Sequence, residues 1–341
     1  MAKETALELD SALAPPSQAP AWRKMLRMAR AHPLGVFGLF CILLIMFCAI
    51  FADFIMPYDP EAIAELGEPV KQSPSLAHPF GTDRLGSDTF SRTIFGARIA
   101  MIIGVVSVVV GMTLGSAVGI ASGYFGGFVD SVLQRLIDAL LAFPAIVLLL
   151  AIIAVIGNED SAVRSFLNST PLPSGTVWGI PNFLDVIIIS LAIGFAIAVG
   201  AARVIRGAVL SLKENVYIDA ARAMGASDWR IMVRHVLPNV AALIVVLGTI
   251  FLPIAILAEA AISFLGIGLP SGTPSWGSDM GDESNRLDAI NRGVWWVVFF
   301  PGLALSLVVL GFNLVGDSFR DISDPRLRGG GGSGSASRTG F

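Results

Sequence analysis

Long apolar runs alternate with polar segments along this chain, and each run is long enough to cross a lipid bilayer. An α-helix needs about 20 apolar residues to span the hydrocarbon core of a membrane. The pattern therefore predicts an all-α, polytopic membrane protein with six transmembrane helices. We expect these helices at residues 34–56, 99–124, 129–156, 183–205, 239–266 and 293–315. The first run exceeds the apolar core of a cleaved signal peptide, so we interpret it as a retained helix.

Two prolines inside the runs predict bends. Pro144 lies in the third predicted helix and Pro253 in the fifth. Proline removes a backbone hydrogen bond and kinks a helix, so the two halves of each helix could tilt separately. Close to the first bend, Arg135 and Asp138 are three residues apart. That spacing lets them pair on one helix face.

Glycine recurs at every fourth position of the second predicted helix, at Gly111, Gly115, Gly119 and Gly123. A spacing of four places these residues on one helix face. The missing side chains let another helix approach closely there. Such a stripe is either a packing seam between helices or the wall of a substrate path, and packing is the commoner role.

A polar segment at residues 217–238 has the pattern of two short helices joined by an elbow. Its alanines favour a helix, and Gly225 can adopt the left-handed backbone that ends one. Ser227 is a suitable N-cap for a second helix, with Asp228 in the first turn, where the helix dipole favours an anion. The elbow carries little side-chain bulk, so another protein could approach its backbone closely. The alternative is an ordinary helical hairpin.

The polar segments divide the chain into five parts. We expect a disordered tail with a basic flank, a first transmembrane helix, an extracytoplasmic segment, a core of five further helices and a second tail. The basic flank either lies on anionic lipid as a helix or fixes the orientation of the first helix, and the second role is the commoner. The boundaries are 1–33, 34–56, 57–98, 99–316 (including the polar loop 206–238) and 317–341.

Composition and charge add the compartment and the orientation. Of 341 residues, 54% are hydrophobic and 14% are charged, whereas proteins on average contain about 25% charged residues. Six helices place both termini on one side. That side, with the turn at Arg135 and the stretch 203–234, holds 16 Lys and Arg, against 7 on the other side. Because positive charge concentrates in cytoplasmic segments, we predict that the termini and the polar loop face the cytoplasm.

The chain lacks the motifs of an ATPase or a hydrolase. No GxxxxGK[ST] phosphate-binding loop occurs, and neither HExxH nor GxSxG is present. We therefore expect a non-enzymatic chain that binds no cofactor and takes its energy from elsewhere. The three histidines are scattered, which predicts no metal site.

Three carboxylates lie inside or beside the apolar runs, at Asp53, Asp138 and Glu259. Carboxylates within a membrane are costly and often functional. An ion-coupled secondary transporter or a channel would use such groups near the middle of the bilayer. All three are expected near helix ends, where solvation or pairing lowers their cost, so this alternative is the weaker one.

The polar segment resembles a family signature. Its residues match the EAA loop of ABC-transporter permeases, which reads Glu-Ala-Ala, three residues, Gly, nine residues, Ile, one residue, Leu-Pro. The chain departs from this pattern with Asp219 in place of Glu and His235 in place of Ile. The matching positions are Asp219, Ala220, Ala221, Gly225, Leu237 and Pro238.

Four further stretches resemble the permeases of the dipeptide, oligopeptide and nickel branch, and the resemblance extends over most of residues 34–328. The first, GTDRLGSDTFSR at residues 81–92, follows an N-terminal extension typical of that branch. The others are RLIDALLAFPAIVLLLAI, AEAAISFLGIGLP and GDSFRDISDPRLR. The resemblance identifies the chain as a member of the peptide-type permeases.

This resemblance implies a type I ABC importer permease fold in a prokaryotic inner membrane, passing di- or oligopeptides, with nickel or another small solute as the alternative. It implies a second homologous permease, two ABC ATPases carrying ATP and Mg²⁺, and an extracytoplasmic solute-binding protein, within membrane lipid and without nucleic acid. The substrate-binding residues remain unassigned. The residues it assigns to the ATPase-coupling loop are Asp219, Ala220, Ala221, Arg222, Gly225, Ala226, Ser227, Asp228, Leu237 and Pro238.

Overall fold

The computed structural model describes most of the chain between residues 30 and 323. The described residues are 30, 32–65, 68–157, 161–170, 176–180, 183–270 and 272–323. Most of the predicted N-terminal tail and the end of the predicted C-terminal tail lie outside these ranges.

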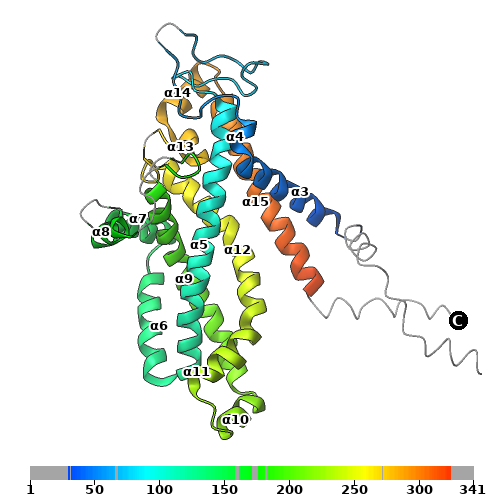
Figure 1. The fold of residues 1–341 in the computed structure, drawn as a ribbon, viewed down its shortest axis with the longest axis vertical. Coiled ribbons are helices and arrows are strands. Elements are labelled where there is room, and N and C mark those ends of the chain that lie inside the picture. The colour runs from blue at the N-terminus through cyan, green and yellow to red at the C-terminus, as the bar shows by residue number, and fades with distance from the viewer. Residues whose placement is uncertain are drawn as a thin grey trace, which may run out of the picture.

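The described part of the chain is all-α, as the apolar runs predict, with two isolated β-bridges and no strand. Figure 1 shows the helices in order. Their bounds are α3 (Pro33–Ile50), α4 (Ala52–Ile55), α5 (Thr89–Phe125), α6 (Gly127–Leu141), α7 (Ala145–Ile156), α8 (Ala162–Ser169), α9 (Phe183–Lys213), α10 (Val216–Ala223), α11 (Asp228–Ile231), a π-helical turn (Met232–Val236), α12 (Leu237–Phe264), α13 (Trp276–Gly281), α14 (Glu283–Asn291) and α15 (Trp296–Ser323).

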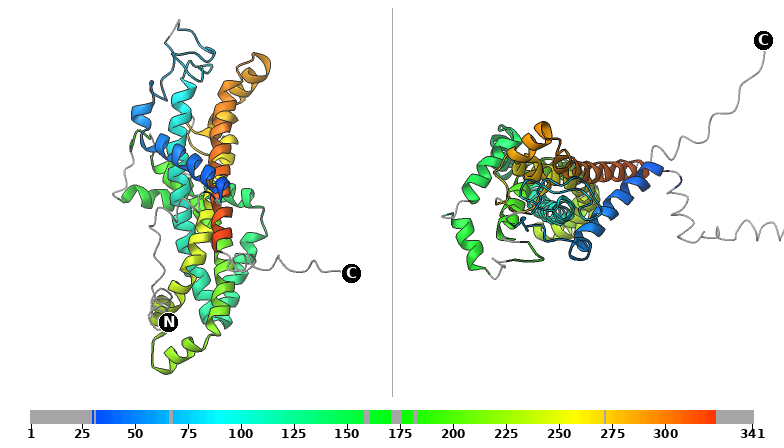
Figure 2. Two further views of the ribbon diagram at one scale, coloured as in Figure 1. Left: turned by 90° about the vertical axis from the view of Figure 1, so that its right-hand side faces the viewer. Right: turned by 90° about the horizontal axis from the view of Figure 1, so that it is seen from above.

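Three long helices, α5, α9 and α12, form the central bundle (Figure 1). Helices α3 and α15 pack on each other and extend to one side of it, while α6, α7 and α8 lie on the opposite side (Figure 2). Helices α10 and α11 form one tip of the molecule, here called the elbow end. Helices α13 and α14 and the segment 57–88 lie at the other tip, here called the latch end.

Five spans are long and apolar enough to cross a membrane, and a sixth is broken into two helices. The break separates α6 from α7, whose axes differ by 99°. The prediction of a single kinked helix over residues 129–156 was therefore wrong. Pro144 is the N-cap of α7 and has an extended ψ of 135°. The backbone therefore leaves the helical conformation at this residue, whereas a kink would bend one continuous helix.

The second span begins ten residues earlier than the apolar pattern predicts. Helix α5 starts at Thr89, where the Asp88 carboxylate accepts hydrogen bonds from the backbone N–H and the hydroxyl of Ser91, at 2.8 and 2.7 Å. This side-chain cap fixes the helix start in a polar sequence that hydropathy does not mark. With 37 residues, α5 is about 55 Å long and extends beyond a hydrocarbon core of about 30 Å.

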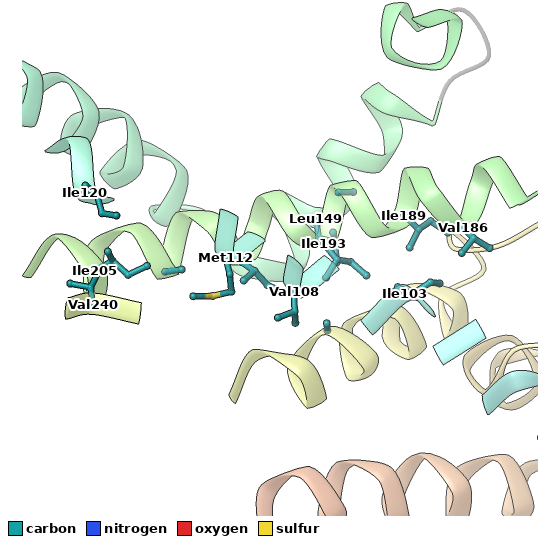
Figure 3. Close-up of a cluster of buried hydrophobic side chains, with 14 of the residues drawn as sticks. Ile103, Val108, Met112, Ile120, Leu149, Val186, Ile189, Ile193, Ile205 and Val240 are labelled. Carbon is teal, nitrogen blue, oxygen red and sulfur yellow. The ribbon is translucent and has the colours of Figure 1, made fainter. Parts of the chain in front are cut away.

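The main core lies along the contact between α5 and α9, with α7 and α12 beside it. Figure 3 shows Ile103, Val108 and Met112 of α5 facing the isoleucines of α9. The glycine stripe of α5 lies on this same contact. A Cβ atom built on Gly115 would lie 2.8 Å from the Ala201 Cβ, and one on Gly119 would lie 2.6 Å from the Ala202 carbonyl oxygen. The two backbones are therefore too close for any side chain at these positions.

Candidate functional site

The elbow is built by a helix-ending motif at Gly225. This residue has φ +82°, in the left-handed region that glycine adopts without strain. The Ala226 N–H donates to the Ala221 carbonyl at 3.1 Å, and the Gly225 N–H donates to the Arg222 carbonyl at 3.0 Å. These two bonds form a Schellman motif, which satisfies the last carbonyls of α10 and turns the chain.

The second arm of the elbow starts at the N-cap predicted from the sequence. The Ser227 hydroxyl accepts from the Arg230 N–H at 3.4 Å, and Asp228 is the first residue of α11. The chain then passes through the π-helical turn Met232–Val236 into α12, with Pro238 in the first turn of that helix. A π-turn is a wide, less regular part of a helix and often occurs at functional sites.

The two alanine positions of the signature face opposite ways. Ala220 is exposed, but Ala221 is only 3% exposed and belongs to the main core beneath the elbow. A bulky side chain at Ala221 would therefore collide with this chain itself. The outer surface of the elbow instead presents three large apolar side chains, here called the elbow patch: Val216, Met224 and Trp229.

The remaining loop residues assigned by the resemblance lie on the same surface or at its edge. Asp219 and Arg222 form an ion pair with 3.6 Å between the charged atoms, and both side chains are largely exposed. Leu237 and Pro238 are exposed at the start of α12, about one turn beyond the elbow, and Ala226 is half-buried. Most of the loop residues are thus exposed on short helices, and the turn between those helices is fixed by backbone hydrogen bonds.

The three carboxylates inside or beside the apolar runs have different surroundings. Asp138 pairs with Arg203 of α9, so the prediction that it pairs with Arg135 was wrong. Asp53 makes a two-pronged ion pair with Arg98, both bonds at 2.9 Å. Glu259 is only 1% exposed and accepts a hydrogen bond from the Ser263 hydroxyl at 2.8 Å. It is therefore a carboxylate inside the protein, whereas a solvated or ion-paired group near a helix end was expected.

The latch end joins segment 57–88 to α13 and α14. Arg92 of α5 donates two hydrogen bonds to one carboxylate oxygen of Asp279 in α13, at 3.0 and 2.5 Å. The Trp276 indole N–H donates to the Thr93 carbonyl at 2.8 Å. We call Arg92, Asp279 and Trp276 the latch. All three side chains are largely buried, so the latch fixes the far end of α5 to α13.

Two aspartates around the latch have shifted pKa values. Burial raises the pKa of Asp83 above its ordinary value, and the positive charge of Arg92 partly opposes that shift. A hydrogen bond from the Lys71 ammonium group lowers the pKa of Asp288, and the two charged atoms are 2.6 Å apart. The ion pair with Lys71 therefore ties Asp288 of α14 to a distant segment of the chain.

Comparison with known proteins decides the family. Residues 111–329 match the model of the binding-protein-dependent transport system inner membrane component. Residues 21–78 match the N-terminal TM domain of oligopeptide transport permease C. This chain is a member of the binding-protein-dependent permease family. The predicted resemblance to peptide-type ABC permeases is confirmed, and the permease is a multi-pass protein of the inner membrane.

Curated relatives align with nearly the whole permease. The glutathione transport system permease protein GsiD of Pectobacterium atrosepticum is 36% identical over 90% of both chains. The protein of that name from Shigella flexneri is 40% identical, also over 90% of both. A putative peptide transport system permease protein of Brucella suis is 38% identical over 85% of this chain and 87% of its own.

Sequence reasoning missed several residues that hold this permease together. Tyr124 and Asp130 belong to a polar cluster on the bundle side of the elbow. In this cluster, Arg206 donates two hydrogen bonds of 2.5 Å to the Asp130 carboxylate. Asp130 was visible as an acidic residue in the first turn of a predicted helix. The motif at residues 81–92 contains Arg92, but nothing in the sequence pattern marked its pairing with Asp279 or the role of Tyr124, because the partners are 187 and 104 residues away.

Proposed function

We propose that this permease is one half of the membrane pathway of an ATP-driven importer that passes di- or oligopeptides into the cytoplasm. The observation that carries the proposal is the elbow, a rigid turn with an exposed apolar patch at one tip of the bundle. The names of the relatives, which mention peptides and glutathione, support peptides as the solute class. The excess of Lys and Arg supports a cytoplasmic location for the elbow end.

The partners follow from this role. Two ABC ATPases would carry ATP and Mg²⁺ and dock at the elbow, because this chain has no phosphate-binding loop. A second, homologous permease would complete the pathway, and a solute-binding protein would deliver the peptide at the latch end. Closure of the ATPases would move the elbow. The α6–α7 break and Pro253 inside α12 are two places where the spans can bend.

An ion-coupled transporter is the less favoured alternative. Asp53 and Asp138 each face an arginine, and a carboxylate neutralised by a fixed arginine is a poor carrier of a transported cation. Glu259 is the carboxylate left for such a role. Uptake driven by an ion gradient in vesicles without ATP would support that alternative.

A pull-down from the native membrane tests the docking site. We expect the tagged permease to recover ATPase subunits and a second permease. Trp229→Ala should weaken recovery of the ATPases, because an interface tryptophan contributes about 2 kcal/mol, or roughly 30-fold in affinity. The matched control is Trp178→Ala at the other end of the bundle, since the two tryptophans are 70% and 72% exposed.

The docking role and the coupling role of the elbow are tested by different variants. Gly225→Pro should uncouple ATP hydrolysis from transport, because proline cannot adopt φ +82° and the turn must reopen. Recovery of the permease alone would contradict the importer proposal. Equal recovery of ATPases by the Trp229→Ala and Trp178→Ala chains would remove the elbow patch as the docking surface.

A further inference from the structure

Tyr124 connects the elbow to the longest helix of the bundle. It is the second-last residue of α5 and is 3% exposed. Its hydroxyl donates a hydrogen bond of 2.7 Å to the Asp228 carboxylate, at the start of α11. Asp228 itself is exposed, so the bond is partly buried. A hydrogen bond to a charged acceptor is about twice as strong as a neutral one. The bond therefore holds the second arm of the elbow against α5.

Two basic residues complete the surroundings of this tyrosine. Arg222 of α10 lies 3.5 Å from the Tyr124 hydroxyl oxygen and 5.8 Å from the ring centre. The Lys213 ammonium group, at the end of α9, donates to the Tyr124 carbonyl at 2.6 Å and lies 5.9 Å from the ring centre. Both arms of the elbow and the end of α9 thus meet on one side chain.

The other end of α5 carries the latch. Arg92 and Thr93 bind α13, and the glycine stripe fixes the middle of α5 to α9 without space for sliding. Near the elbow, Ser122 of α5 and Arg206 of α9 both bind Asp130 of α6. Because α5 is continuous over 37 residues, a displacement of its elbow end must reach the latch end.

The direct covalent route from the elbow is less rigid. It passes through the π-helical turn Met232–Val236 into α12, which contains Pro253. Irregular turns and internal prolines absorb movement because their backbone hydrogen bonds are incomplete. A displacement of α11 is therefore transmitted more completely through its contact with α5 than through the covalent connection into α12.

We infer that the Tyr124 hydroxyl, through its hydrogen bond to Asp228, is the joint that passes movement of the elbow to α5 and so to the latch end. Tyr124 is in this sense a positioning residue for ATP-driven transport. The inference rests on the proposed coupling role of the elbow. It adds a defined side-chain contact and a defined route across the membrane.

The test measures movement at the latch end in the complete transporter, reconstituted in proteoliposomes. Cys41 and Cys48 are replaced by alanine, and a cysteine is placed at Leu85, which is exposed beside Asp83. A membrane-impermeant maleimide then reports the labelling rate without nucleotide and with ATP plus vanadate. This readout requires no knowledge of the transported solute.

We expect the two labelling rates to differ in the otherwise unaltered chain. Tyr124→Phe should bring their ratio close to one, because without the hydroxyl the elbow is no longer bonded to α5 and its movement does not reach the latch end. ATP hydrolysis and the labelling rate without nucleotide should stay unchanged, whereas a merely structural defect would lower ATP hydrolysis and alter the labelling rate without nucleotide. Asp228→Ala should lower the labelling ratio in the same way, and Asp228→Asn, which keeps an acceptor oxygen, should preserve more of the ratio than Asp228→Ala; because Asp228 belongs to the coupling loop, these two variants are compared by the ratio alone.

The matched control is Tyr58→Phe, which makes the same chemical change at the latch end, where Tyr58 stacks on His78. It should leave the ratio unaltered. A full labelling difference in Tyr124→Phe, or equal rates in the unaltered chain, would overturn the inference. If Gly225→Pro uncouples transport while Tyr124→Phe keeps the full difference, the role proposed for the Tyr124–Asp228 bond is wrong and the coupling role of the elbow stands. If Gly225→Pro transports normally, the coupling role of the elbow fails as well.

Discussion

Replacing Arg92 by methionine should lower the free energy of unfolding by about 3–5 kcal/mol, because it leaves the buried Asp279 carboxylate without its partner. The Arg92 and Asp279 side chains are 14% and 5% exposed, so water compensates little for the lost bonds. Arg92 also donates to the Pro60 carbonyl at 3.1 Å, which ties the segment after α4 to the same point. The loss should appear as a lower temperature of thermal unfolding in detergent.

The permease provides a matched control eight residues away. Arg84 lies 3.9 Å from Asp282, and both side chains are about two-fifths exposed. Such an exposed pair contributes about 0–1 kcal/mol, so Arg84→Met should leave the unfolding temperature almost unchanged. Equal destabilisation by the two variants would show that the buried pair has no special role at the latch end.

Replacing Gly115 by leucine should destabilise the permease by about 3 kcal/mol or more, because a side chain in a filled core forces the backbone apart. Even the first carbon of that side chain would lie 2.8 Å from the Ala201 Cβ and 3.0 Å from the Ala198 carbonyl oxygen. Neither atom belongs to a flexible side-chain tip, so α5 and α9 must separate. The expected result is a reduced yield of folded protein and early unfolding on heating.

Gly207 of α9 is the control for this substitution. It is also a helical glycine, but a Cβ atom there would meet nothing within 4 Å in the described structure. Gly207→Leu should therefore be tolerated, with a gain of up to about 1 kcal/mol from helix propensity. If Gly115→Leu unfolds no earlier than Gly207→Leu, the stripe is not a packing seam, and the wall of a substrate path becomes its better explanation.

Local patterns in the sequence determine much of this architecture. Apolar runs of bilayer length predict long helices, because burying backbone polar groups in lipid leaves few alternatives. Ser227 and Gly225 mark the elbow through capping preferences that act over a few residues. Spacing by four places the glycines on one face of α5. Each of these inferences depends only on residues within the same segment of the chain.

Contacts between distant segments are decided only by the tertiary structure. Periodicity shows which residues share a helix face but not which helix comes to lie against it. Asp138 therefore pairs with Arg203 across the bundle although Arg135 is nearer in sequence. The same reason explains why Ala221 faces the core beneath the elbow, and why Tyr124 meets Asp228, 104 residues away.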